Sequence, residues 1–143
     1  MTKWNTIPLY SRLRDAAEIS ELATNQSEQL LGDVATFIRC DRPSDRWWWR
    51  SASKDAFVIS YDDKGVVFGN FWNELFDQNS AVYMSVTDSF TPPWPVFRGR
   101  LGTCLTCVLD SPHAEFFIFD KELSWLVFDT HHNSLHAFGV LKR

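Results

Sequence analysis

The alternation of hydrophobic and polar positions is clearest in the last thirty residues of the chain. Two apolar runs, at 116–119 and 125–128, are separated by a short charged break, and a polar turn at 131–134 leads into a third run. Apolar runs of this length joined by polar turns predict a meander of three antiparallel strands. Both faces of the first two runs are apolar, so we expect these strands to be covered on both sides and central in a sheet. The positions expected to be most buried are Phe117, Phe119, Trp125 and Val127.

The first forty residues have a helical pattern instead. Residues 15–22 are rich in Ala, Glu, Ile and Leu and predict a short helix. Asn25, followed three residues later by Glu28, is typical of a capping box. Behind it, an apolar stripe recurs at helical spacing and predicts a second helix that ends near Cys40: Leu30, Leu31, Val34, Phe37 and Ile38.

Shorter elements are expected between these two regions. They are a strand pair at 57–61 and 65–68, a helical turn at 70–76 and a strand at 81–86. Residues 101–109 fit a helix or a strand, and we favour the helix because this segment links two regions of the sheet. Pro92-Pro93-Trp94-Pro95 predicts a rigid loop, because proline blocks regular structure. The pattern therefore predicts an α+β fold, with N-terminal helices packed against one face of an antiparallel sheet and the C-terminal meander at its centre. The length of the chain predicts a single domain that spans residues 1–143.

Aromatic residues make up 15% of the chain, and they include 12 Phe and 7 Trp. Trp47, Trp48 and Trp49 are consecutive and cannot all point to one side of a strand. Trp94 lies between two prolines. We expect these four rings to be the least buried of the aromatic side chains, because they lie in irregular segments. Tryptophan is enriched in the binding hot spots of protein interfaces.

The net charge of the chain argues against nucleic acid as a partner, and the lack of targeting and membrane-spanning segments suggests where the protein is located. A charge of −4 argues against nucleic-acid binding, which requires a basic surface. The chain has neither a signal-peptide pattern nor an apolar run long enough to span a membrane, so no membrane association is expected. Three cysteines are an odd number for a disulfide framework. A cytoplasmic protein with reduced thiols is the expectation.

Two groups of residues could carry chemistry. His131-His132 and the spacing Cys104-x-x-Cys107 offer nitrogen and sulfur ligands, but a structural zinc site normally shows two paired-ligand motifs, and adjacent side chains of a strand diverge. We expect neither a metal nor another cofactor. A Cys/His pair of Cys104 or Cys107 with His113 has no supporting motif. Carboxylates are plentiful, among them Asp110, Glu115, Asp120 and Asp129, but their pairing cannot be read from the sequence.

Several motifs together resemble a known family. They are Trp47-Trp48-Trp49, Pro93-Trp94-Pro95-Val96-Phe97, Glu115-Phe116-Phe117-Ile118, Trp125-Leu126-Val127, His131-His132-Asn133 and Gly139. The series is similar to that of an uncharacterised family of small bacterial proteins, whose members resemble immunity proteins of toxin systems. Phe128-Asp129-Thr130 departs from the Cys-Glu-Asn that is more typical there. The resemblance implies a single-domain binder with a cognate toxin as its partner, and it transfers no catalytic residue.

The function predicted from these observations is that of a non-catalytic immunity protein. Its contact surface should combine exposed rings with carboxylates, because rings anchor an interface and charges steer the encounter. The expected contact residues are Trp47, Trp48, Trp49, Asp62, Asp63 and Trp94. The alternative is a small hydrolase or metal-dependent enzyme that uses His131 and His132. That enzyme would need both imidazoles in a concave pocket beside an acid.

Overall fold

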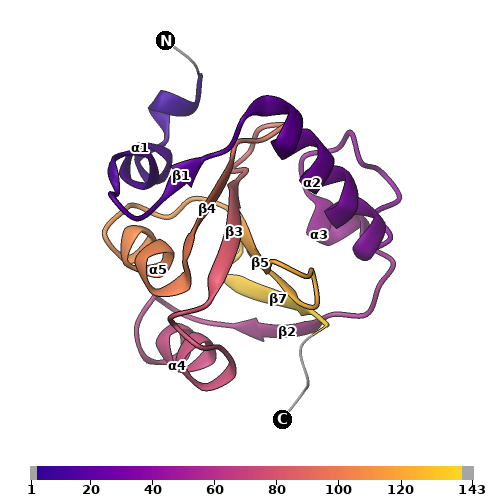
Figure 1. Cartoon of the computed structure of the whole chain (residues 1–143). Helices are drawn as coiled ribbons and strands as arrows, with labels where there is room; N and C mark the ends of the chain where they lie inside the picture. The colour runs from indigo at the N-terminus through magenta and orange to yellow at the C-terminus, as the bar shows by residue number, and fades with distance from the viewer. Residues whose placement is uncertain (1–2, 140–143) are drawn as a thin grey trace.

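An antiparallel sheet runs through the middle of the molecule, and helices cover both of its faces (Figure 1). The computed structural model describes residues 3–139. Its helices are η1 (Lys3–Thr6), α1 (Pro8–Asp15), α2 (Thr24–Phe37), α3 (Trp48–Ser51), α4 (Val66–Leu75) and α5 (Leu101–Leu109). Its strands are β1 (Ser20–Glu21), β2 (Phe57–Ser60), β3 (Ala81–Val86), β4 (Val96–Arg100), β5 (Phe116–Asp120), β6 (Leu126–Asp129) and β7 (Ser134–Phe138).

The strands within residues 3–139 form one seven-stranded sheet in the order β1-β4-β3-β5-β6-β7-β2. Every pair of neighbours is antiparallel. The predicted meander of β5, β6 and β7 is confirmed, and β5 is the middle strand. β1 and β2 are the two edges of the sheet.

Side chains of the central strands alternate between two hydrophobic cores. Phe116 and Ile118 of β5 belong to a core that also contains residues of α1, α4 and α5. Phe117 and Phe119 belong to a second core, which contains residues of α2 and α3. All four side chains are at most 1% exposed. Burial on both faces is what the doubly apolar pattern predicted.

The same observation corrects one part of the predicted fold. The helices were expected on one face of the sheet, but α2 and α3 lie on one face and α1, α4 and α5 on the other. A sheet whose central strands are apolar on both sides loses a hydrophobic layer if either side is left to water. The later helices, α4 and α5, supply part of the cover on the second side.

Several helix boundaries also differ from the prediction. The first helix begins at Pro8, in the N1 position where proline is favoured, and ends at Asp15, so the helix expected at 15–22 is wrong. Ser20 and Glu21 form the edge strand β1 instead. The capping box is also wrong, because α2 begins after Ala23 and no side chain caps it. The strand expected at 65–68 is the first turn of α4.

Trp125 is less buried than expected. It precedes β6 and is partly exposed, with its ring 4.3 Å from that of Phe76 at the border of the first core. Phe117, Phe119 and Val127, the other three positions named as most buried, are all inside. The helix predicted at 101–109 and the strand predicted at 81–86 are confirmed as α5 and β3.

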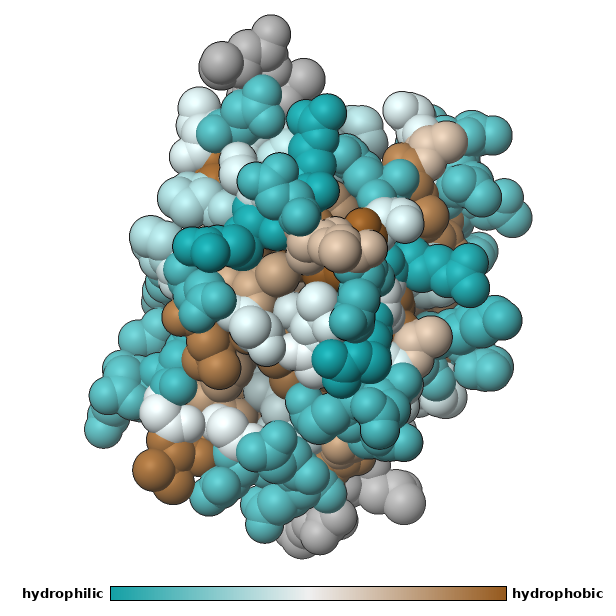
Figure 2. Space-filling model, turned by 60° about the vertical axis from the view of Figure 1, so that its left-hand side comes forward, coloured by the Kyte–Doolittle hydropathy of each residue, from teal (hydrophilic) through white to brown (hydrophobic). Residues whose placement is uncertain are grey.

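The outer surface carries few large apolar side chains. Figure 2 shows the side on which α1, α4 and α5 lie, where hydrophobic residues form separate patches among hydrophilic ones. Within the described residues, the large hydrophobic side chains that are exposed are those of Val58, Val66, Val67 and Leu109. Among residues 3–139, no helix is both long enough and apolar enough to cross a bilayer.

Amide hydrogen exchange is expected to be slowest in β5 and β6. Both strands are paired on both sides and covered on both faces, so their amides open only with the largest unfolding events. Exchange followed by NMR would rank the strands. If the amides of β2, an edge strand, exchanged as slowly as those of β5, this description of the sheet centre would be contradicted.

Candidate functional site

Two buried carboxylates lie together at one end of the sheet. Glu115 comes directly before β5, and Asp129 is the last residue of β6, where it is paired with Phe116. Because β5 and β6 are antiparallel, the start of one strand lies beside the end of the other. Glu115 is 3% exposed and Asp129 is 1% exposed. Buried carboxylates are costly unless they are paired, so this end of the sheet must supply partners.

Asp129 receives its partners from the segment that follows β2. The Tyr61 hydroxyl donates to Oδ1 at 2.5 Å, and Nζ of Lys64 lies 3.4 Å from Oδ2. Burial raises the pKa of Asp129 to about 6, although Lys64 and Tyr61 partly oppose the rise. The same burial, together with Asp129, raises the pKa of the Tyr61 hydroxyl, which therefore stays protonated.

Lys64 also connects Asp129 to a histidine. Its Nζ lies 2.5 Å from Nδ1 of His113, and Nε2 of His113 lies 3.0 Å from the carbonyl oxygen of Thr130. A carbonyl can only accept, so Nε2 carries the proton and Nδ1 accepts from Lys64. Burial, followed by the charge of Lys64, lowers the pKa of His113. His113 is therefore a neutral link between the lysine and the turn that joins β6 to β7.

Glu115 holds the other side of that turn. The main-chain N–H of His131 donates to Oε2 of Glu115 at 2.6 Å, and Nδ1 of the His131 ring contacts the same oxygen. Burial raises the pKa of Glu115, and the contacts with His131 lower it in part. The Trp49 indole lies close enough to Glu115 to lower this pKa as well, although neither Nε1 nor Oε1 has a well-formed hydrogen bond among the described residues.

Tryptophan and histidine rings cover this network. The His131 ring lies 5.0 Å from the Trp47 ring and 5.8 Å from the Trp49 ring. Trp49 also contacts His132 and His136, at 5.9 and 5.1 Å. We call the surface formed by Trp47, Trp49, His131 and His132 the Trp–His face. Two guanidinium groups, those of Arg46 and Arg50, lie over the Trp47 ring at 5.2 and 5.0 Å.

Four of the six predicted contact residues lie at this end of the sheet. Trp47 and Trp49 are partly exposed and belong to the Trp–His face. Asp62 and Asp63 are exposed and directly follow Tyr61, whose backbone N–H donates to the carbonyl of Asn133 in the β6–β7 turn at 3.0 Å. The two segments are far apart in the sequence, and the pairing of β2 with β7 brings them together.

The other two predicted contact residues are inside the protein. Trp48 is 3% exposed and Trp94 is 2% exposed, so the expectation that irregular segments leave these rings at the surface is wrong. The two rings lie 4.8 Å apart, and both pack on Phe117. Their indole N–H groups donate to backbone carbonyls, of Pro43 and of Phe90. Trp48 lies in the short helix α3 and Trp94 in the proline-rich loop, and at both positions a local carbonyl accepts the indole proton inside the core.

Sequence reasoning missed Tyr61 and Lys64. It placed Tyr61 at the end of the strand expected at 57–61 and Lys64 in the turn that follows, and no pattern in the sequence indicates that a lysine of a turn enters a buried network. His113, His131 and His132 lie together at this end of the sheet. Among residues 3–139, no group of three or more His, Cys, Asp or Glu side chains is placed so that it could hold a metal. Cys104 and Cys107 are buried in α5, and burial raises the pKa of the Cys104 thiol to about 12.

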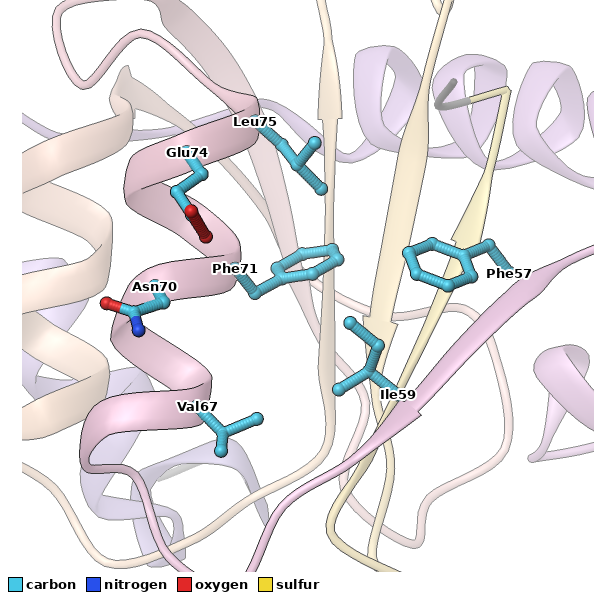
Figure 3. Close-up of a pocket in the computed structure, with 7 residues that line it drawn as sticks. All are labelled: Phe57, Ile59, Val67, Asn70, Phe71, Glu74 and Leu75. Atoms are coloured by element: carbon cyan, nitrogen blue, oxygen red, sulfur yellow. The ribbon is translucent and has the colours of Figure 1, made fainter. Parts of the chain in front are cut away.

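The cavities around α2 and α4 are lined by other residues. We describe four cavities in these regions. The largest of the four has a volume of about 480 Å³ and lies between α2, the Pro43 loop and Pro92. A groove of about 310 Å³ lies between α4 and β2, and its lining is mainly apolar, with Asn70 and Glu74 as its polar members (Figure 3). None of the four is lined by Glu115, Asp129 or a histidine. No residue of the Trp–His face lines any of them.

Chemically, the arrangement offers one group with catalytic potential. With Nδ1 of His131 engaged by Glu115, Nε2 is the nitrogen left to accept a proton, as in a general base that a carboxylate orients. Lys64, His113, Tyr61 and Asp129 satisfy one another instead. Their network holds the β6–β7 turn, and thereby His131, in a fixed position.

The comparisons with known proteins show an uncharacterised family, which is the coarser part of the resemblance seen in the sequence. The model of a family of unknown function, DUF6756, matches residues 14–143. No match is found among the curated proteins.

Proposed function

The chain therefore belongs to DUF6756, a family of unknown function, and we propose a function from the geometry of the site. The protein is a non-catalytic, cytoplasmic immunity protein of bacteria that binds and neutralises a cognate toxin domain. The observation that carries the proposal is the Trp–His face. Trp47 and Trp49, at the start of α3, are partly exposed and pack on His131 of the β6–β7 turn, which buried groups hold in place. Binding hot spots are enriched in Trp and Arg, and Arg46 and Arg50 lie over Trp47.

The buried network supports binding because it makes the face rigid. Asp129, Lys64, His113 and Glu115 tie together the ends of β2, β5 and β6 and the turn between β6 and β7. A surface held in its bound conformation loses little entropy on association, so more of the contact energy contributes to affinity. Asp62 and Asp63 lie at the border of this face, where exposed charges act mainly on the rate of encounter.

A second candidate function rests on the Glu115–His131 pair. Side-chain exposure of His131 is 39%, and Glu115 orients its ring, which is the arrangement required of a general base in a hydrolase. A metal-dependent enzyme is less well supported, since His131 and His132 are not joined by a third ligand among the described residues. A hydrolase should lose its turnover when His131 is replaced by Gln, whereas an immunity protein should show no turnover before or after this change, and only its affinity for the toxin should respond.

The test uses a toxin encoded beside the gene of this protein. Trp47→Ala and Trp49→Ala are each expected to weaken binding by about 2 kcal/mol, roughly a 30-fold rise in Kd, because truncation removes a ring from the centre of the contact. Isothermal titration at two salt concentrations would measure it. Trp125→Ala is the matched control: it is also a partly buried tryptophan, but it lies at the opposite end of β6.

The possible outcomes test the choice of binding surface and the immunity function separately. Equal affinities for the parent, Trp47→Ala and Trp49→Ala would show that another surface binds the partner. A neighbouring toxin that the parent protein neither binds nor inhibits would contradict the immunity function itself. Circular dichroism of each variant would establish that the loss of affinity is not a loss of fold.

A further inference from the structure

A small cavity with a partly polar lining lies between α2 and the strands β3 and β4. Its volume is about 250 Å³, and we call it the α2–β4 cavity. Its polar lining residues come from one helix and two strands, and they are Gln26, Gln29, Asp33, Tyr83 and Arg98. No residue of the Trp–His face or of the buried network beneath that face lines this cavity, so the site described above does not account for it.

Helical spacing places three of these polar residues on one side of α2. Gln26, Gln29 and Asp33 are separated by three and four positions, and residues at these spacings are neighbours on the surface of a helix. Leu31 and Val34 of the same helix are buried in the second core instead. The polar row therefore follows the border along which α2 meets the sheet.

The register of the sheet brings the other two polar residues to the same border. Tyr83 of β3 lies directly opposite Arg98 of β4, so both side chains are on one face of the sheet. The Tyr83 ring is half-buried and lies 5.3 Å from the ring of Phe119, which belongs to the second core. This is the face that α2 covers, and Arg98 is thereby placed beside the polar row of the helix.

The protein does not use these polar groups for its own contacts. Within residues 3–139, Arg98 and Asp33 form no ion pair, either with each other or with another residue. The Tyr83 hydroxyl and the side-chain amides of the two glutamines form no hydrogen bond within that part of the chain. Arg100 of the same strand differs, because it bonds to Glu18 and to the loop before β3. Five polar side chains thus converge on one cavity with their hydrogen-bonding capacity open to a ligand.

We propose that the α2–β4 cavity binds a free α-amino acid with an apolar side chain. Arg98 and Asp33 bring opposite charges to one small cavity without neutralising each other. A ligand with a single charge would be attracted by one of these groups and repelled by the other, whereas a zwitterion satisfies both. The planar guanidinium matches a carboxylate, and an ammonium group has three donors for the Asp33 carboxylate and a glutamine carbonyl.

The size and the apolar part of the cavity select the ligand's side chain. A cavity of about 150 Å³ holds a benzene molecule, so one of about 250 Å³ has room for a ligand roughly one and a half times as large. Leu22 and Leu30 are the apolar members of the lining, and both are half-buried. An aliphatic side chain placed against them is removed from water, which favours binding. L-Leucine has the required size, both charges and such a side chain.

Titration of the purified protein with L-leucine, followed by NMR, tests the proposal. The side-chain amide signals of Gln26 and Gln29 are expected to shift and to saturate with a Kd of about 1 mM, because a small open cavity offers few contacts. Two analogues test the zwitterion: 4-methylpentanoate lacks the ammonium group, and 3-methylbutylamine lacks the carboxylate. Each analogue is expected to bind at least tenfold more weakly than L-leucine, because each leaves one charged group of the cavity without a partner.

Substitutions locate the binding in this cavity. Arg98→Gln and Asp33→Asn each change an exposed side chain, so both variants should fold, and each is expected to raise the Kd for L-leucine at least tenfold. Arg42→Gln removes the same charge from an exposed arginine outside the cavity and should leave the Kd unchanged. The proposal is overturned by the absence of saturable shifts up to about 20 mM L-leucine, by an analogue that binds as tightly as L-leucine, or by parental affinity in either cavity variant. No toxin takes part, so the outcome is separate from that of the proposed function.

Discussion

Replacing Phe117 by Ala is expected to lower the free energy of unfolding by about 3–5 kcal/mol. Phe117 is fully buried at the centre of the second core. Its ring lies 4.9 Å from that of Phe128, 5.9 Å from Phe119 and 6.0 Å from Trp94. Removing it would leave a cavity between β5 and the loop that carries Trp94. Because the neighbouring rings are rigid and are held by their own contacts, they can close that cavity only in part.

Urea denaturation of parent and variant would measure the effect. Val66→Ala serves as the control, because this side chain is 76% exposed and its truncation should change stability by no more than about 0.5 kcal/mol. The fluorescence maximum of the folded Phe117→Ala variant should also shift, since Trp48 and Trp94 both pack on Phe117. A loss of less than 1 kcal/mol would mean that the core repacks around this position far more easily than the contacts indicate.

The sequence predicted the meander because its signal is local. A strand that is buried on both faces is a continuous apolar run, and polar turns separate the runs at 116–119 and 126–128. The period of two also predicted β3, and the period of the helix predicted α5 and most of α2. No contact between distant segments is needed to recognise such patterns.

Secondary structure was predicted wrongly in two kinds of segment. In one, residues fit both the strand period and the helix period; in the other, the prediction rested on composition and not on a periodic apolar pattern. Val66 and Val67 favour a strand by their branched side chains, yet Phe68, Phe71 and Trp72 recur at helical spacing and pack into the first core. Tertiary burial of that helical stripe decides the outcome. Residues 15–22 have a helical composition without an apolar stripe, and Ser20 and Glu21 pair with β4 instead.

The candidate site was predictable only in its composition. The histidines and carboxylates were visible in the sequence, but Glu115 meets His131 and Asp129 meets Tyr61 only through the register of β5, β6, β7 and β2. The exposed rings could not be told from the buried ones for the same reason. Trp47 and Trp48 are neighbours in sequence, and one covers His131 while the other packs on Phe117.

Replacing Lys64 by Met is expected to cost about 3 kcal/mol of stability at pH 7.5, because it leaves the Asp129 carboxylate buried without its cation. The cost should depend on pH. In the parent protein the pKa of Asp129 is raised from 3.8 to about 6, so the folded state binds this proton more tightly than the unfolded state does. The stability contributed by the protonated carboxyl is fully present below about pH 4 and is lost as the pH rises through 6.

Lys64 lowers the pKa of Asp129, so its removal should raise that pKa further and extend the loss of stability to higher pH. Near pH 4.5 the carboxyl is largely protonated in both folded proteins, and the cost of Lys64→Met should fall to about 1 kcal/mol or less, since a neutral carboxyl needs no cation. Urea denaturation of both proteins at pH 4.5, 6.0 and 7.5 would follow this convergence. Lys121→Met, at an exposed position between β5 and β6, is the control for loss of a positive charge.

Repeating Lys64→Met in an Asp129→Asn background isolates the interaction between Lys64 and the Asp129 carboxylate. Asn keeps an oxygen for the Tyr61 hydroxyl but carries no charge, so the additional replacement of Lys64 by Met should cost much less at pH 7.5 than it does in the parent. Glu115 also has a raised pKa and His113 a lowered one. Because Lys64 itself lowers the pKa of His113, the effect of Lys64→Met on His113 occurs in both backgrounds and cancels only when the two backgrounds are compared. If Lys64→Met cost the same at pH 4.5 and 7.5, or the same with Asn at position 129, then Lys64 stabilises the turn through His113 rather than through the buried carboxylate.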